Sequence, residues 1–76
     1  MIETMIKLDK VGAASGFANL TPKISGDVTL YSDKYVVNGK SIMGIYSLDL
    51  TKPIKMEING EIPDEVKEGM KQYIVD

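Results

Sequence analysis

The chain has 76 residues, of which 43% are hydrophobic and 26% are charged, and its formal net charge is −2. This composition is typical of a soluble globular protein, and the length predicts a single domain over residues 1–76. The absence of Cys, and therefore of disulfides, fits the cytoplasmic location that we expect. No hydrophobic run approaches the roughly 18 residues of a membrane-spanning helix, and scattered lysines on a net negative chain give no basic surface for nucleic acid. We therefore expect neither a membrane nor a nucleic acid as partner.

Several reactive residue types are missing. The sequence contains no His, no Cys and no Trp, and all nine of its basic residues are Lys. Catalysis by a His base, a phosphohistidine and a thiolate nucleophile are therefore excluded within these residues. Zinc sites of the usual Cys and His type are excluded as well. We expect no metal site and no cofactor.

The first third of the chain predicts a strand followed by a weak helix. Hydrophobic and polar residues alternate over residues 2–8, which is the pattern of a half-buried strand. A loop is expected at residues 9–12. Residues 13–21 have the spacing of a short helix, which Pro22 ends because a proline disfavours the helical conformation of the residue before it. Ile24 is expected to cover the core.

The middle of the chain predicts a hairpin, a short helix and a further strand. Residues 27–32 and 35–37 alternate as two strands joined by a turn. A short helix is expected at residues 41–48. Residues 54–58 then alternate cleanly as the next strand, and Asn59-Gly60 is a turn signal.

The last element is expected to be a helix that begins near Pro63, because proline suits the first helical position and Asp64 and Glu65 place negative charge at the positive end of the helix dipole. Four hydrophobic residues recur at helical spacing to form its buried stripe. They are Val66, Met70, Tyr73 and Ile74.

The predicted order is βαββαβα, and a four-stranded sheet that is hydrophobic on one face needs helices on that face. This is a two-layer α/β (α+β) domain. Nine residues are predicted to share its core. They are Ile6, Val28, Leu30, Ile54, Met56, Ile58, Val66, Met70 and Ile74.

The segment around Ser41 has the features of a docking site. Asn38-Gly39 ends the preceding strand, and Ser41 is a good helix N-cap. At 100° per residue the helix has two hydrophobic sides. One side contains Gly44, Ile45 and Leu48, and the opposite side contains Ile42, Met43 and Tyr46. Because a two-turn helix in a small domain can bury only one side, the second should remain exposed as a hydrophobic patch.

The same segment resembles a known family. Residues 40–45 read Lys-Ser-Ile-Met-Gly-Ile and are followed by Ser47-Leu48. This segment is similar to the regulatory-serine segment of HPr, the phosphocarrier protein of the bacterial sugar phosphotransferase system, in its Gram-positive form. The similarity runs without a gap from Asp27 to Gly60 and then loosely to the C-terminus, while residues 1–26 match much less well. It implies the HPr fold, an open-faced sandwich with an antiparallel sheet.

The resemblance also separates two activities of the family. In HPr the phosphoryl carrier is a histidine at the start of the first helix, in a Gly-x-His-x-Arg-Pro-like motif. This chain has Val11-Gly12-Ala13-Ala14-Ser15-Gly16 there, and an ungapped register places Lys10 at the histidine position. Because the chain has neither His nor Arg, the resemblance leaves only the regulatory serine, which corresponds to Ser41.

HPr kinase/phosphorylase phosphorylates that serine in HPr relatives with this motif. The resemblance therefore implies that Ser41 is a regulatory phosphorylation site, and that a docking surface for this enzyme or a transcription regulator lies beside it. The residues expected in that surface are Lys40, Ile42, Met43 and Tyr46.

The resulting hypothesis is a histidine-less, HPr-like regulatory and interaction protein that is not an enzyme. The alternative is a degenerate HPr-fold binding module with an unrelated partner and an unmodified Ser41. An enzyme with a Lys or carboxylate site is a third reading, although no such residues are convincingly grouped in the sequence.

We predict that the chain accepts no phosphoryl group from enzyme I of the phosphotransferase system and phosphoenolpyruvate, because it contains no His. The measurement is phosphate incorporation after that incubation. Acid-labile, base-stable phosphate on the purified chain would contradict the prediction.

Overall fold

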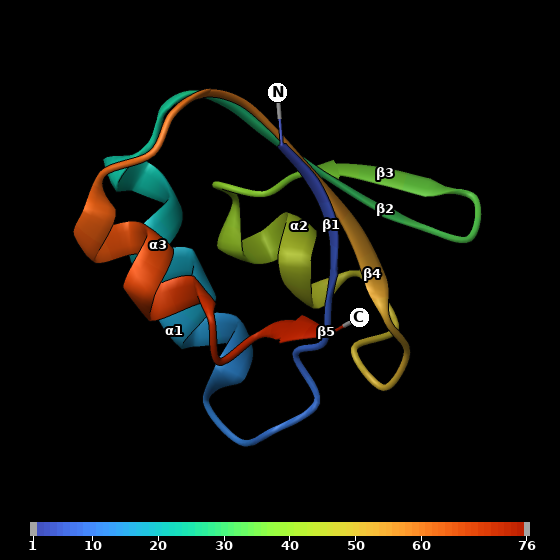
Figure 1. Cartoon of the computed structure of the whole chain (residues 1–76). Coiled ribbons are helices and arrows are strands. Elements are labelled where there is room, and N and C mark those ends of the chain that lie inside the picture. Colours follow the sequence, from blue (N-terminus) through green and yellow to red (C-terminus); the bar gives the residue numbers. More distant parts are fainter. Residues whose placement is uncertain (1, 76) are drawn as a thin grey trace.

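The computed structural model describes residues 2–75 and has one sheet with the helices gathered on one of its faces (Figure 1). Its elements are β1 (Ile2–Ile6), α1 (Ala13–Leu20), a 3₁₀ turn η1 (Thr21–Lys23), β2 (Ser25–Ser32), β3 (Tyr35–Asn38), α2 (Ile42–Tyr46), β4 (Ile54–Glu61), α3 (Asp64–Met70) and β5 (Ile74–Val75). No helix within residues 2–75 has the length and hydrophobicity needed to cross a lipid bilayer.

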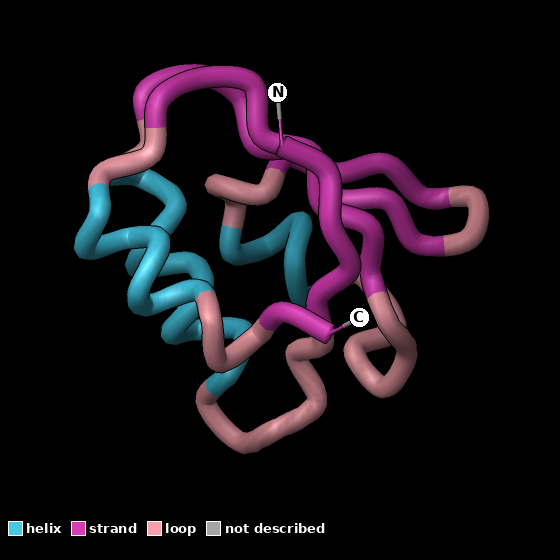
Figure 2. Tube along the Cα trace, viewed as in Figure 1, coloured by secondary structure: helices cyan, strands magenta, loops and turns pink. Residues whose placement is uncertain are grey.

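The strands, which are magenta in Figure 2, form one sheet in the order β3-β2-β4-β1-β5, and every neighbouring pair is antiparallel. The register places Ile6 opposite Ile54, and Met56 of the central strand opposite Leu30. Because side chains alternate between the two faces of a strand, these hydrophobic residues all point to the helical side. The predicted open-faced antiparallel sandwich is therefore confirmed.

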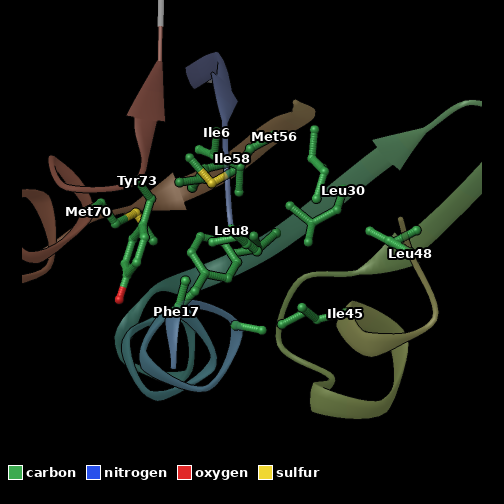
Figure 3. Packing of buried hydrophobic residues seen from close by; sticks show 14 of the residues in the cluster. Ile6, Leu8, Phe17, Leu30, Ile45, Leu48, Met56, Ile58, Met70 and Tyr73 are labelled. Carbon is green, nitrogen blue, oxygen red and sulfur yellow. The ribbon is translucent and has the colours of Figure 1, made fainter. Parts of the chain in front are cut away.

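The core lies between the sheet and the helices (Figure 3). Phe17 of α1 is fully buried, and its ring meets the ring of Tyr73 edge to face at a centroid distance of 5.9 Å. This contact packs α1 against the turn that follows α3 and contributes beyond simple burial of the two rings. Eight of the nine predicted core residues are buried; Ile74 is the exception.

The sequence prediction that places Ile74 in the last helix and in the core is wrong. The helix ends at Met70, and the chain turns so that Ile74 pairs with Ile6 in a fifth strand at the edge of the sheet. The sheet therefore has five strands, one more than predicted. The Ile74 side chain is 38% exposed, because the edge position that it takes lies beyond the short α3.

The turn predicted at Asn59-Gly60 is also wrong, since β4 continues to Glu61. Gly60 pairs with Gly26 of β2, and both have positive φ angles, 150° and 116°. A Cβ on Gly60 would overlap the carbonyl oxygen of Ser25. The two glycines therefore let the ends of β2 and β4 bend and approach closely, where a turn was expected from the sequence.

Other element boundaries shift by a few residues. The first strand ends at Ile6, but Leu8 beyond it is still buried. The short helix covers residues 42–46, with Ser41 as its N-cap, and not residues 41–48. α3 begins at Asp64, directly after Pro63. Ile24 is buried as predicted.

The opposite face of the sheet carries a polar network. Lys55 forms ion pairs with Glu3 at 3.0 Å and with Glu57 at 3.6 Å, and the Tyr31 hydroxyl donates to Glu57 at 3.2 Å. Desolvation and the Glu57 carboxylate raise the pKa of Tyr31, and the Glu3 carboxylate raises the pKa of Lys55. A face covered by such charged groups needs no helix to shield it from water.

We predict that Gly60→Ala lowers the free energy of unfolding by more than about 1 kcal/mol, because alanine is strained at this φ and its Cβ meets the Ser25 carbonyl. Chemical denaturation would measure the loss. The control is Asn59→Ala, an exposed position in the same strand, which should change stability by less than about 0.5 kcal/mol. Equal effects of the two substitutions would contradict the close approach of β2 and β4.

Candidate functional site

Ser41 is the N-cap of α2, as the sequence predicts. Its backbone is extended (φ −99°, ψ 114°), and its Oγ accepts a hydrogen bond from the Gly44 N–H at 3.1 Å. The Ser41 carbonyl accepts from the Ile45 N–H at 3.0 Å, which starts the helical bonding. The serine hydroxyl therefore lies at the first turn of α2 and is only partly buried.

The segment before Ser41 is held by three hydrogen bonds from distant parts of the chain. The buried Thr21 hydroxyl donates to the Gly39 carbonyl at 2.9 Å, and the Gly39 N–H donates to the Val28 carbonyl at 2.7 Å. The Lys40 ammonium donates to the Ile24 carbonyl at 2.8 Å. These bonds tie the start of α2 to β2 and to both ends of η1, so the position of Ser41 is fixed from outside α2 itself.

The two sides of α2 are separated as predicted. Ile45 is fully buried and Leu48 is 6% exposed. Figure 3 shows Ile45 reaching from α2 into the core. The opposite side is in solvent, with Ile42, Met43 and Tyr46 exposed by 40%, 79% and 56%. We call these three residues the α2 patch. Its exposure confirms the sequence prediction.

Lys40 has a structural contact that the sequence did not indicate. Its side chain is half-buried, and its ammonium is bound by the Ile24 carbonyl, 16 residues away in the chain. The sequence predicts Lys40 as a cation next to Ser41 and as part of the docking surface. The hydrogen bond from Lys40 to the Ile24 carbonyl also connects the start of α2 to the end of η1.

The Ser41 hydroxyl is not arranged as a nucleophile. Within residues 2–75, the Ser41 hydroxyl accepts a hydrogen bond from the Gly44 N–H, and no general base forms a hydrogen bond with it. A serine without a base partner is a weak nucleophile.

The loop before α1 borders a cavity of about 440 Å³. The helix starts at Ala13 after Gly12, without a side-chain cap. Lys10 lies in this loop, while Lys7 is paired with Asp9 at 3.6 Å. The residues that line the cavity are Lys7, Asp9, Lys10, Val11, Gly12, Ala13, Gln72, Tyr73 and Val75. Its charged lining residues are two lysines and one aspartate, and because the sequence contains no His, no imidazole is present to carry a phosphoryl group.

Metal binding has no support in the described part of the chain, residues 2–75, where no group of three or more potential ligands among Asp, Glu, His and Cys comes together. Several carboxylates already form hydrogen bonds or ion pairs with other side chains. Asp49, for example, accepts hydrogen bonds from both the hydroxyl and the N–H of Thr51, which lower its pKa.

Two solved structures share this architecture. HPr-C-His from Thermoanaerobacter tengcongensis is 26% identical, with a TM-score of 0.75, over 95% of this chain and 89% of that one. The phosphocarrier protein HPr from Bacillus anthracis str. Ames is also 26% identical, with a TM-score of 0.72, over 97% of this chain and 96% of that one. None of the curated proteins matches the chain.

The family model described as the PTS HPr component phosphorylation site matches residues 10–75. The match covers the loop before α1, the Ser41 segment and α3 together, and it agrees with the fold and with both solved structures. This chain belongs to the HPr family of the phosphotransferase system.

Proposed function

We propose that this chain is a regulatory interaction protein of the phosphotransferase system, with Ser41 as a phosphorylation site and the α2 patch as the surface that a protein partner contacts. The observation that carries the proposal is the position of a partly exposed cap serine directly beside three exposed hydrophobic side chains. In this proposal the protein is cytoplasmic, is not an enzyme, and acts by binding a protein partner.

The residue content supports a regulatory role over a phosphoryl relay. The 76 residues contain no His, so the cavity beside Lys10, whose charged lining residues are Lys7, Asp9 and Lys10, has no imidazole that could carry a phosphoryl group. The family fold is retained without the residue that carries phosphate in HPr. What remains usable is the surface around α2.

A phosphate on Ser41 would change that surface strongly. It would add about −1.5 to −2 charges and three acceptor oxygens at the Oγ that now accepts from the Gly44 N–H. The phosphate oxygens could accept from the same N–H. The neighbouring α2 patch is hydrophobic, so modification would turn a neutral contact surface into one with a strong charge at its edge.

The α2 patch has the composition of a protein contact. Met43 and Tyr46 are large side chains with more than half of their surface in solvent. Aromatic residues and Met are enriched in protein interfaces. By resemblance, the partner is HPr kinase/phosphorylase or a transcription regulator, with Lys40 at the border of the contact.

A second function has its own support. The hydroxyl of Ser41 is fully accounted for as a cap, because its bond to Gly44 stabilises the start of a five-residue helix. A binding module with an unrelated partner would need the same cap without any phosphorylation. The two functions share the α2 patch and differ in the partner and in whether Ser41 is modified.

We predict that Ser41→Ala lowers the free energy of unfolding by about 1 kcal/mol through loss of the cap. Ser41→Asp should remain near wild type, because a carboxylate also accepts from the Gly44 N–H. The control is Ser15→Ala, at an exposed position inside α1, which should cost nothing. The denaturation midpoints of the three variants would measure these changes in stability. A Ser41→Ala variant as stable as the wild type would show that the cap contributes nothing to stability.

The phosphorylation itself is tested by incubating the chain with HPr kinase/phosphorylase and ATP and locating phosphate by mass spectrometry. We expect one phosphate on Ser41 in the wild type and none in Ser41→Ala, whose folding is checked by circular dichroism. Absence of phosphate on the folded wild type would reject this enzyme as its modifier and favour the unmodified binding module.

The docking role of the α2 patch is tested in the same assay with Met43→Ser. Because Met43 is 79% exposed, stability should hardly change, while the rate of phosphorylation at low substrate concentration should fall about fivefold or more. The control is Val36→Ser on β3, where an equally hydrophobic residue is 63% exposed. If both variants are phosphorylated at the wild-type rate, Met43 is not part of the contact.

A further inference from the structure

A second hydrophobic site lies between α3 and the sheet, and it shares no residue with the α2 patch. It is a groove of about 200 Å³. Its lining comes from β1, β4, α3, β5 and the connection between β4 and α3. The lining residues are Ile2, Thr4, Met56, Ile58, Ile62, Lys67, Met70, Lys71 and Ile74.

The groove exists because α3 is too short to cover this end of the sheet. The helix has seven residues and packs toward α1, and the chain then leaves for β5. Ile2 and Ile74 point to the helical side of the sheet but are 42% and 38% exposed. Met56, beneath them, is 1% exposed and forms part of the floor. Within residues 2–75, these two side chains of the core layer are therefore only partly covered.

Within residues 2–75, the charged side chains that line the groove are both lysines. Lys67 lies on α3 and Lys71, its C-cap, follows one helical turn later, so both ammonium groups can reach the same end of the groove. Neither Asp nor Glu is among the lining residues. Lys71 is paired with Glu68 at 2.9 Å, whereas within residues 2–75 no ion pair is recorded for Lys67. The groove thus combines an aliphatic interior with an available cation.

We propose that this groove binds a medium-chain alkyl carboxylate, with the alkyl chain along Ile2, Met56 and Ile74 and the carboxylate at Lys67. A dry hydrophobic cavity of about 150 Å³ is enough for a benzene ring, so a groove of about 200 Å³ suits one alkyl chain of medium length. This volume is below the roughly 300 Å³ at which sites for larger ligands begin. The lining has no aromatic ring, which favours a flexible alkyl chain over a planar ligand.

The test is a titration of the full chain with octanoate, followed by NMR of the isoleucine methyl groups. We expect saturable shifts at Ile2, Ile62 and Ile74, while the methyl group of Ile42 on the α2 patch stays unchanged. Acetate, which has the charge but no chain, should cause no such shifts. An absence of saturable shifts at the groove isoleucines with octanoate would overturn the proposal.

Variants separate the head group from the alkyl chain. Lys67→Gln should weaken octanoate binding about two- to fivefold, as expected for a solvent-exposed ion pair, and the control Lys34→Gln in the β2–β3 turn should not. If octanol binds wild type as well as octanoate does and Lys67→Gln has no effect, the carboxylate assignment is wrong. If the NMR signals of the groove isoleucines shift when the protein is diluted, but not when ligand is added, the groove is a contact between copies of the chain and the proposal fails.

Discussion

The burial of Ile45 is the constraint on which the candidate site depends. α2 has only five residues, and so short a helix is not stable in water without tertiary contacts. Ile45 supplies the main contact by entering the core, and it thereby fixes which side of α2 faces solvent. The hydrogen bonds at Gly39 and Lys40 then set where the helix begins. Ser41 and the α2 patch owe their common position to these contacts.

Much of the fold could be predicted because its signals are local. Alternation in residues 27–32 and 54–58 gives the core-facing side of each strand directly. The predictions for Ile74 and for Asn59-Gly60 are wrong because contacts with distant parts of the chain determine the structure at these positions. Ile74 continues the helical spacing of α3, but pairing with β1 draws it into a strand. Asn59-Gly60 has the composition of a turn, but its partner Gly26 makes it part of a bent strand.

The candidate site divides in the same way. The cap at Ser41 and the exposure of Met43 follow from residue types and helical spacing, so the sequence was sufficient for both. The bond from Lys40 to Ile24 and the groove beside Lys67 join residues that are distant in sequence, and no periodic pattern indicates them. A helix that is too short for its sheet is recognised only when both are placed in space.

The central proposal is that HPr kinase/phosphorylase contacts the chain through the surface around Ser41. The most direct measurement is an NMR titration of the isotope-labelled chain with HPr kinase/phosphorylase, following the backbone amide signals. The account predicts that shifts and broadening concentrate at residues 40–46 and leave the α3 groove and the open face of the sheet unchanged. Perturbations confined to those other surfaces, or no perturbation at all, would contradict it.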